Sequence, residues 1–321
     1  MDLAGLGEFG FLEHVRRWIP ESAALVGIGD DAAVVRLSDG ASLVATTDAL
    51  VEGVHFRWDW SAPADVGYKA VAVNVSDLAA MGAEPRWLLV SLCAPAATST
   101  DLLRELYEGF AQACAAFGAE LVGGDTVSAD QIVLAVTALG EVAGDPLLRS
   151  GAEIGDVLAV TGPLGRASAG VNLLLSQDPK KVTPEDALAC MDAHRRPMPR
   201  LQEGPLLRAA GVHAAIDVSD GLASDARRLS ESSGVGVELD ADRLPVAPEA
   251  RRIADARGWD AERMVLGGGE DLELLVAVAP DDLDGVPVDL IQVGRVVEEG
   301  VWLVRDGQRA PLEAEGWDHF R

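Results

Sequence analysis

Continuous apolar runs, typical of strands, alternate along the first half of the chain with segments in which apolar residues recur at helical spacing. Runs rich in Val, Leu and Ile predict strands at 42–47, 86–93, 120–123 and 131–142. Apolar residues at helical spacing predict two helices between these runs, one from about Pro63 to Gly82 and one from Ser99 or Thr100 to Gly118. This alternation of strands and helices indicates a mixed α/β (α+β) fold.

A second alternation follows a segment rich in Gly, Pro and charge, AGDPLLRSGAEIGD at 143–156. Such a segment is typical of a domain boundary, and 321 residues are more than one core of ordinary size requires. We therefore expect an N-terminal domain at 1–146 and a C-terminal α/β domain at 147–321. The pattern beyond the boundary predicts strands at 157–161, 214–218, 235–240, 272–279, 288–297 and 301–305, and helices at about 165–176, 184–195, 199–210, 221–232 and 247–257.

Six apolar runs end in small residues followed by an acidic residue. They are VGIGDDAAV (26–34), LVATTDAL (43–50), AVNVSDLAAMGA (72–83), LVGGDTV (121–127), AIDVSDGLASD (215–225) and VLGGGEDLELL (265–275). Only 26 Lys and Arg face 52 Asp and Glu, and almost none of the basic residues lies in these segments. Because an isolated carboxylate in apolar surroundings costs several kcal/mol, these groups require cations from outside the chain. Ligand sets of oxygen alone, without His or Cys, favour hard divalent ions, Mg²⁺ first.

Asp77 is the least ordinary of these carboxylates. It lies in the middle of a predicted helix and shares one face with Ala70, Val73 and Met81. A charge without a counter-ion there would lower stability, so a metal ligand is favoured over a solvated or hydrogen-bonded aspartate.

Glycines and hydroxyl groups accompany the other carboxylates. Thr46 and Thr47 add hydroxyl and carbonyl oxygens beside Asp48, and GGDT resembles a strand that ends in a phosphate-facing turn. Asp217 and Asp220 end a strand where a helix begins, and capping of that helix is the alternative role of Asp220. Six such segments, divided between two domains, predict a metal and nucleotide cleft at the domain interface.

Charge and cysteine content exclude other classes of protein. A formal net charge of −26 argues against nucleic acid or an anionic membrane as a partner. The three cysteines form no CxxC pair, which is typical of core thiols in a reducing compartment. No signal-peptide pattern and no long uninterrupted apolar run is present, so we expect a cytoplasmic protein. The Gly-rich TGPLGRASAG lacks the Lys-Ser/Thr of a Walker A loop, so a tight turn is favoured over a phosphate contact.

The ordered set of motifs resembles the bacterial thiamine-monophosphate kinases, which belong to one superfamily with aminoimidazole ribonucleotide synthetase and selenophosphate synthetase. The resemblance runs nearly end to end, through GEFGF, GIGDDAA, TTDALVEGVHF, YKAVAVNVSDLAAMGAEP, LVGGDT, LLRSGA, AIDVSDGLASD, GGGEDLEL and GWDHF. It implies ATP-dependent phosphorylation of thiamine monophosphate to thiamine diphosphate by direct in-line transfer, assisted by several Mg²⁺ ions. It also implies a homodimer in which strands of the two N-terminal domains build a shared barrel.

The resemblance also implies roles for particular residues. The positions that match Mg²⁺ ligands are Asp31, Thr46, Thr47, Asp48, Asp77, Asp125, Asp217 and Asp220. The positions that match ATP contacts are Tyr107, Gly124, Asp125, Arg149 and Ser219, and those that match thiamine-phosphate contacts are His55, Glu270 and Trp317. No acid or base is expected, because a phosphate oxygen of the acceptor is already ionised near neutral pH and needs only charge neutralisation by metal bound at Asp48, Asp77 and Asp125.

Two alternatives remain open. One is another ATP-dependent member of the superfamily, such as an aminoimidazole ribonucleotide synthetase-like enzyme. A selenophosphate synthetase is disfavoured because the first cysteine, Cys93, lies inside a predicted strand, and a hydrogenase-maturation relative because the chain ends without a cysteine. The second alternative is a non-catalytic sensor of nucleotide or metal, against which the complete ligand set argues.

Overall fold

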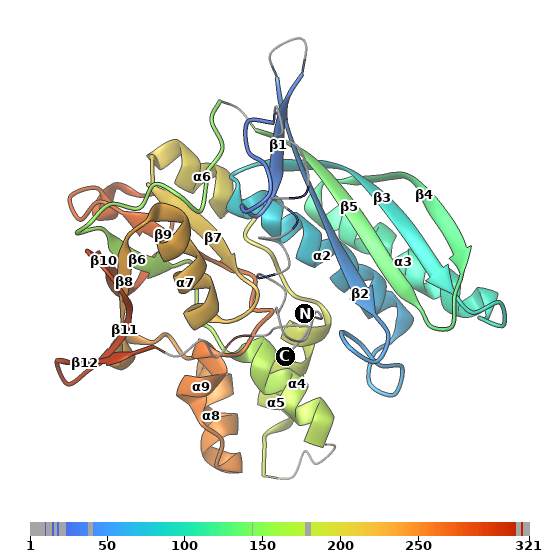
Figure 1. The fold of residues 1–321 in the computed structure, drawn as a ribbon. Coiled ribbons are helices and arrows are strands. Elements are labelled where there is room, and N and C mark those ends of the chain that lie inside the picture. The colour runs from blue at the N-terminus through green and yellow to red at the C-terminus, as the bar shows by residue number, and fades with distance from the viewer. Residues whose placement is uncertain are drawn as a thin grey trace.

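A computed structural model describes residues 10, 15, 18, 24–37, 41–142, 144–176, 181–312 and 316. Within these residues the chain forms two β-sheets, each with its own helices, so the fold is mixed α/β (Figure 1). No helix in the described part of the chain is both long and apolar enough to cross a membrane. The first half of the chain builds one sheet and the second half builds the other.

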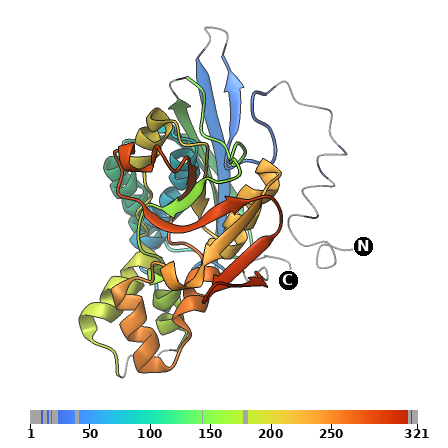
Figure 2. The same ribbon diagram turned by 90° about the vertical axis from the view of Figure 1, so that its left-hand side faces the viewer.

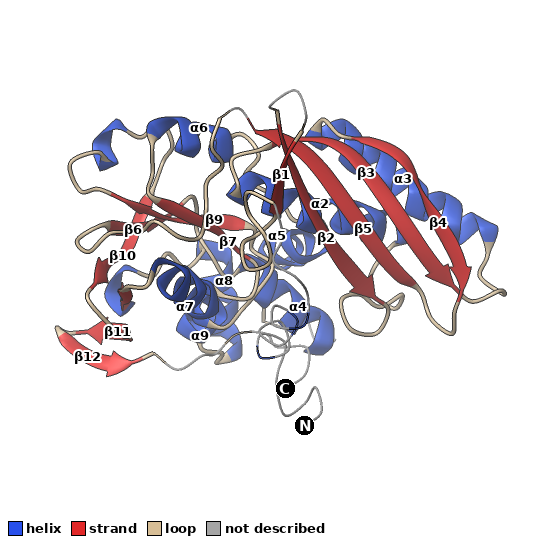
Figure 3. Ribbon diagram, turned by 45° about the horizontal axis from the view of Figure 1, so that its top comes forward, coloured by secondary structure: helices blue, strands red, loops and turns tan. Residues whose placement is uncertain are grey.

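The first sheet has five strands in the order β1-β2-β5-β3-β4, in which only β3 and β4 run parallel. Its strands are β1 (Ala33–Arg36), β2 (Ser42–Val51), β3 (Glu84–Ala94), β4 (Glu120–Ser128) and β5 (Val133–Val142). Helices α2 (Pro63–Ala80) and α3 (Thr100–Phe117) cover one face, as Figure 3 shows. The sheet is open, with β1 and β4 as its edges.

Local signals set the length and packing of α3. The Ser99 side chain accepts a hydrogen bond from the backbone of Asp101, and Gly118 ends the helix in the left-handed conformation at φ 74°. The two helices cross closely, because a Cβ at Gly67 of α2 would lie 2.1 Å from the carbonyl oxygen of Leu106 in α3. This packing holds α2 firmly against α3, and hydrogen bonds join Asn74 and Asp77 of α2 to β2.

The second sheet has seven strands in the order β12-β11-β8-β10-β6-β9-β7, in which only β8 and β11 run parallel. Its strands are β6 (Val157–Val160), β7 (Ala214–Val218), β8 (Gly236–Asp240), β9 (Glu273–Val278), β10 (Ile291–Val297), β11 (Val301–Arg305) and β12 (Gln308–Pro311). Its α-helices are α4 (Arg166–Ser176), α5 (Pro184–Arg195), α6 (Glu203–Ala210), α7 (Leu222–Ser233), α8 (Pro248–Arg257) and α9 (Ala261–Leu266). Helices α4, α5, α8 and α9 gather at one end of the molecule around a small apolar core (Figures 1 and 2).

The two halves meet where α2 lies beside β7. Ala80 at the end of α2 packs with Ala215 of β7, and Leu272 of the second half joins the apolar core of the first. The hydroxyl of Ser76 in α2 donates a buried hydrogen bond of 2.6 Å to Oδ2 of Asp217 in β7. Polar side chains of α2 and β7 are therefore brought together in a buried position.

The predicted strands and helices are present, with shifts at their ends. The prediction for 199–210 was wrong at its start, since α6 begins at Glu203, and β1, α9 and β12 were not predicted. GGDT is not a turn: β4 continues through it to Ser128, pairing Gly124 with Val90 of β3. In the glycine-rich segment before α4, which was predicted as a tight turn, the backbone N–H groups of Gly165 and Ala167 donate to the carboxylate of Asp271.

Candidate functional site

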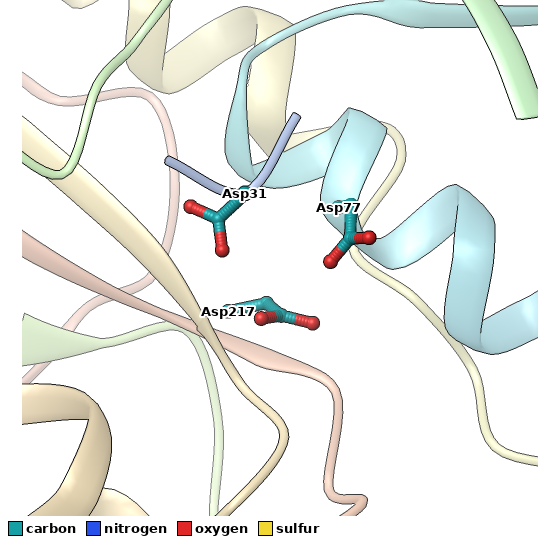
Figure 4. Close-up of side chains that lie close together, drawn as sticks. All are labelled: Asp31, Asp77 and Asp217. Carbon is teal, nitrogen blue, oxygen red and sulfur yellow. The ribbon is translucent and has the colours of Figure 1, made fainter. Parts of the chain in front are cut away.

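Three carboxylates from three distant segments converge between the two halves of the chain. Asp31 precedes β1, Asp77 lies in α2 and Asp217 lies in β7, and one oxygen of each lies within 4.8 Å of the others (Figure 4). Asp31 and Asp217 are buried, and Asp77 is half-buried. We call these three residues the carboxylate cluster.

The electrostatics of the carboxylate cluster are unfavourable without a cation. Burial, followed by repulsion from Asp48, Asp217 and Asp31, raises the pKa of Asp77 well above its usual range. Burial and the nearby Asp31 raise the pKa of Asp217 to about 7. Oδ2 of Asp31 is buried and has no hydrogen-bond partner among the described residues. Such an orphaned oxygen, in a set of hard oxygen donors, fits a divalent cation.

Arg149 supplies a fixed positive charge beside the carboxylate cluster. Its Nη2 donates to Oδ1 of Asp31 at 2.6 Å, and its backbone N–H lies 3.2 Å from both carboxylate oxygens of Asp30. Burial opposes the charge, but Asp31 outweighs it and raises the pKa of Arg149. The hydroxyl of Ser233 in α7 donates to the Arg149 carbonyl at 3.0 Å and so positions this segment. One arginine does not balance three carboxylates.

The residues of β2 are divided between the two faces of the sheet. The Thr46 hydroxyl donates to Oδ2 of Asp77 at 2.6 Å, and the backbone N–H of Asp48 donates to Oδ1 of Asn74 at 2.9 Å. The Thr47 hydroxyl instead donates to the carbonyl of Val136 in β5. Because side chains alternate along a strand, Thr47 points to the other face, away from the carboxylate cluster.

Asp125 is not brought to the carboxylate cluster within one chain. It is exposed on β4, which is separated from β2 by β5 and β3. Three strand spacings amount to about 14 Å. Asp125 instead lines a cavity of about 370 Å³ together with Tyr107 and Gly124. The predicted nucleotide contacts therefore form two groups, one at β4 and one, Arg149 and Ser219, beside the carboxylate cluster.

Gly124 lets β4 approach the β3 backbone closely beside the cavity, and its replacement tests the nucleotide contact predicted there. A Cβ at Gly124 would lie 1.9 Å from the carbonyl oxygen of Val90, whereas at Gly123 it would meet only the flexible end of Leu89 at 3.3 Å. We expect Gly124→Ala to lower the free energy of unfolding by about 1–3 kcal/mol and to weaken nucleotide binding. Gly123→Ala is the matched control and should be nearly neutral in both. Urea denaturation and calorimetric titration with ATP measure the two effects, and equal behaviour of the variants would contradict this role.

The turn that carries Ser219 and Asp220 is held by two residues that sequence reasoning missed. Oδ2 of the buried Asp225 accepts the backbone N–H groups of Ser219 and Asp220, and Arg228 bridges Asp225 and Asp220 at 2.9 and 2.5 Å. Asp220 does not cap α7, whose N-cap is Gly221 without a side-chain hydrogen bond. The only sequence signal was the helical spacing of the Asp225–Arg228 pair.

The predicted acceptor residues lie on facing loops. His55 follows β2, and its Nδ1 accepts the backbone N–H of Val51 at 2.9 Å. Glu270 lies in the glycine-rich loop before β9, and its backbone N–H donates to the carbonyl of Ser219 at 2.8 Å. The same loop, through Gly267 and Gly268, lines a cavity of about 730 Å³ that also includes Gly316. The predicted contact Trp317 lies outside the described residues.

The raised pKa of Asp217 predicts how pH and metal affect stability. Between its ordinary pKa of 3.8 and about 7, the folded chain holds a proton that the unfolded chain has lost, so the free energy of unfolding falls as pH rises. With a chelator, we expect a lower melting temperature at pH 8 than at pH 6. Mg²⁺ should raise it more at pH 8, because ionised carboxylates bind the cation.

Calorimetric melting curves with and without Mg²⁺ measure this effect. Asp217→Asn should weaken the pH-dependent response to Mg²⁺, because only Asp77 of the two carboxylates in the cluster with a raised pKa remains, whereas Asp101→Asn, on the exposed start of α3, should retain the full response. An equal response in the two variants would place Mg²⁺ elsewhere.

Comparison with known proteins defines the class first. The family described as AIR synthase related protein, N-terminal domain, matches residues 29–142, and its C-terminal domain counterpart matches residues 153–301. The fold, the carboxylate cluster and both matches place the chain in the AIR synthase-related class.

Full-length relatives define the family within that class. The chain is 35% identical to thiamine-monophosphate kinase of Bacillus subtilis (strain 168), covering 98% of this chain and 100% of the relative. It is 41% identical to thiamine-monophosphate kinase of Mycobacterium tuberculosis (strain ATCC 25618 / H37Rv), covering 99% and 93%. A solved structure of AaThiL complexed with AMPPCP and TMP has a TM-score of 0.90 at 35% identity and covers 99% of each chain. The chain belongs to the thiamine-monophosphate kinase family.

Proposed function

We propose that this protein transfers the γ-phosphoryl group of ATP to thiamine monophosphate, giving thiamine diphosphate and ADP. The carboxylate cluster carries the proposal, because it gathers negative charge where the two halves of the chain meet. Relatives of the same length are thiamine-monophosphate kinases, and one of them binds an ATP analogue together with TMP. In the transfer, an oxygen of the acceptor phosphate forms a bond to the γ-phosphorus of ATP. The bond between the γ-phosphorus and the β,γ-bridging oxygen breaks, and that oxygen leaves as part of ADP.

Residues of the chain satisfy the needs of this reaction without an acid or base. The acceptor phosphate is ionised near neutral pH, so no proton has to be removed before transfer. Arg149, whose guanidinium is fixed by its hydrogen bond to Asp31, would contact a phosphate of the nucleotide. Ser219 and Asp220 lie in a turn that Asp225 holds in one conformation. The chain contributes binding, alignment and charge.

Mg²⁺ is part of the proposal. Asp31, Asp77 and Asp217, with the hydroxyl of Thr46 and the carboxylate of Asp48 nearby, would hold it, and Asp220 offers a further ligand. When bound, Mg²⁺ would offset repulsion between the acceptor phosphate and the triphosphate. The predicted ligand role of the Thr47 side chain is not supported, because its hydroxyl is bonded within the sheet.

The acceptor is proposed to bind on the side of His55, Glu270 and the 730 Å³ cavity. Most of this cavity is lined by residues of α4 and of the segment from Gly258 to Met264. The loop that carries Glu270 contributes Gly267 and Gly268, and Gly316, which adjoins Trp317 in the chain, completes the lining. An aromatic acceptor would gain apolar contacts there from Trp259 and Met264.

A cytoplasmic homodimer with domains at 1–146 and 147–321 completes the proposal. Separate apolar cores and the two family matches support the division. β4 is an open edge, and Trp87, Leu89, Leu121, Val122 and Val127 expose apolar surface on β3 and β4. A partner joined through these strands, in a shared barrel, would bring its β4 cavity towards the carboxylate cluster and reunite the two groups of nucleotide contacts.

Mixing inactive variants tests that dimer. If Asp77 and Asp125 of one site come from different subunits, a 1:1 mixture of Asp77→Asn and Asp125→Asn should recover about a quarter of wild-type activity. Each variant alone stays inactive. A mixture that recovers no activity although light scattering shows dimers would contradict a site shared in this way.

Activity with purified components tests the function itself. We expect ADP and thiamine diphosphate to form in equal amounts, and only when ATP, Mg²⁺ and thiamine monophosphate are all present. ADP release that does not need thiamine monophosphate would favour another ATP-dependent enzyme of the superfamily. Binding of both ligands without turnover would favour a sensor.

A further inference from the structure

Glu270 has a backbone conformation that residues other than glycine do not favour. Its φ is 67°, in the left-handed region that non-glycine residues rarely adopt, and Leu272 two residues later has φ 50°. Backbone hydrogen bonds from Glu270 to Ser219 and from Leu272 to Val218 fix this path along the end of β7. The surrounding structure therefore determines where the Glu270 carboxylate points.

Lys69 links Glu270 to the loop that carries His55. The Lys69 side chain is 3% exposed and reaches from α2, and its Nζ lies 2.6 Å from Oε1 of Glu270. The same Nζ donates to the backbone carbonyl of His55 at 3.3 Å. One ammonium group therefore contacts both predicted acceptor residues, which belong to different halves of the chain.

His194 contacts the other oxygen of the same carboxylate. It lies near the end of α5, its side chain is 7% exposed, and its Nδ1 lies 2.8 Å from Oε2 of Glu270. Burial would raise the pKa of Glu270, but Lys69 and His194 outweigh it and hold the pKa well below its usual range. The Glu270 side chain remains 27% exposed. It is thus an anion fixed from two sides that still offers a face to a ligand.

We propose that Lys69 and His194 are positioning residues of the acceptor site, which fix the Glu270 carboxylate and align it with the His55 loop. The inference rests on the proposed kinase function and extends its acceptor site by two residues. A carboxylate held in this way suits a cationic aromatic acceptor. Thiamine monophosphate is such an acceptor, because its thiazolium ring carries a positive charge. Neither residue needs to touch the acceptor.

Steady-state kinetics with both substrates separates this role from a structural one. We expect Lys69→Met to raise the KM for thiamine monophosphate at least tenfold while the KM for ATP changes less than twofold. Lys69→Arg should restore most of the loss, since it returns the positive charge. The control is Arg200→Met, which removes a cation from a pair with the buried Glu273 outside the proposed site. It should lower stability without a selective change in the KM for thiamine monophosphate.

A double-mutant cycle tests whether Lys69 acts through Glu270. In a Glu270→Gln background, Lys69→Met should add less than twofold to the KM for thiamine monophosphate. Equal changes in both KM values, or a full additional effect in that background, would overturn the inference. If Lys69→Met does not fold, His194→Leu against His194→Asn, which keeps a donor near Nδ1, gives the same test. A wild-type chain that does not use thiamine monophosphate would instead overturn the proposed function.

Discussion

Replacing Asp77 with asparagine is expected to lower the rate of thiamine diphosphate formation about a thousandfold, which corresponds to about 4 kcal/mol of transition-state stabilisation. The change preserves shape but removes one of the three charges of the carboxylate cluster. Because Asp77 is destabilised by burial and by its acidic neighbours, the metal-free variant should be as stable as the wild type or more stable. Turnover at saturating substrates and urea denaturation with a chelator measure the two effects.

Asp101→Asn serves as the matched control for this experiment, because Asp101 lies exposed in the first turn of α3. It should keep wild-type turnover. An Asp77→Asn protein that turns over at the normal rate under limiting Mg²⁺ would make Asp77 a structural residue. A variant that loses both activity and folding would contradict the expected relief of repulsion.

Replacing Arg149 with methionine is expected to lower the free energy of unfolding of the metal-free protein by about 3–5 kcal/mol. The substitution leaves the fully buried Asp31 carboxylate without its cation, although methionine keeps much of the length of the arginine side chain. Binding of ATP should weaken as well, because the same guanidinium is the proposed phosphate contact. Urea denaturation and calorimetric titration with ATP measure the two losses.

A double variant separates the two roles of Arg149. Adding Asp31→Asn removes the unpaired charge and should restore most of the lost stability, because the cost comes from an uncompensated carboxylate. ATP binding should not recover, since the guanidinium is still missing. Recovery of ATP binding in the double variant would show that Arg149 acts on the nucleotide only through Asp31.

The patterns that predicted the fold were local ones. Ser99 and Gly118 mark the ends of α3 because a cap and a left-handed glycine act within one turn of the helix. β4 was predicted too short because its second half, GGDTVS, has the composition of a turn. Pairing with β3 overrides that preference, since the ladder satisfies backbone groups that a single strand leaves open.

The chemical character of the candidate site, a set of carboxylates that needs cations, was predictable from the sequence. Carboxylates at the ends of apolar runs are costly wherever the chain places them, so the need for cations follows from composition and position. The sequence by itself therefore determined most of the strands and helices, although not β1, α9 or β12, together with the excess of acidic residues and the kind of cation that neutralises them.

Only the tertiary structure decided which groups meet. It placed Asp31, Asp77 and Asp217 together, turned the Thr47 side chain away and left Asp125 three strands from β2. It also showed that Lys69 pairs with Glu270 and Arg228 with Asp220, two ion pairs that the sequence did not predict. The physical reason is that ion pairs and shared ligand sites depend on distances of a few ångströms between segments far apart in sequence, and no local preference encodes those distances.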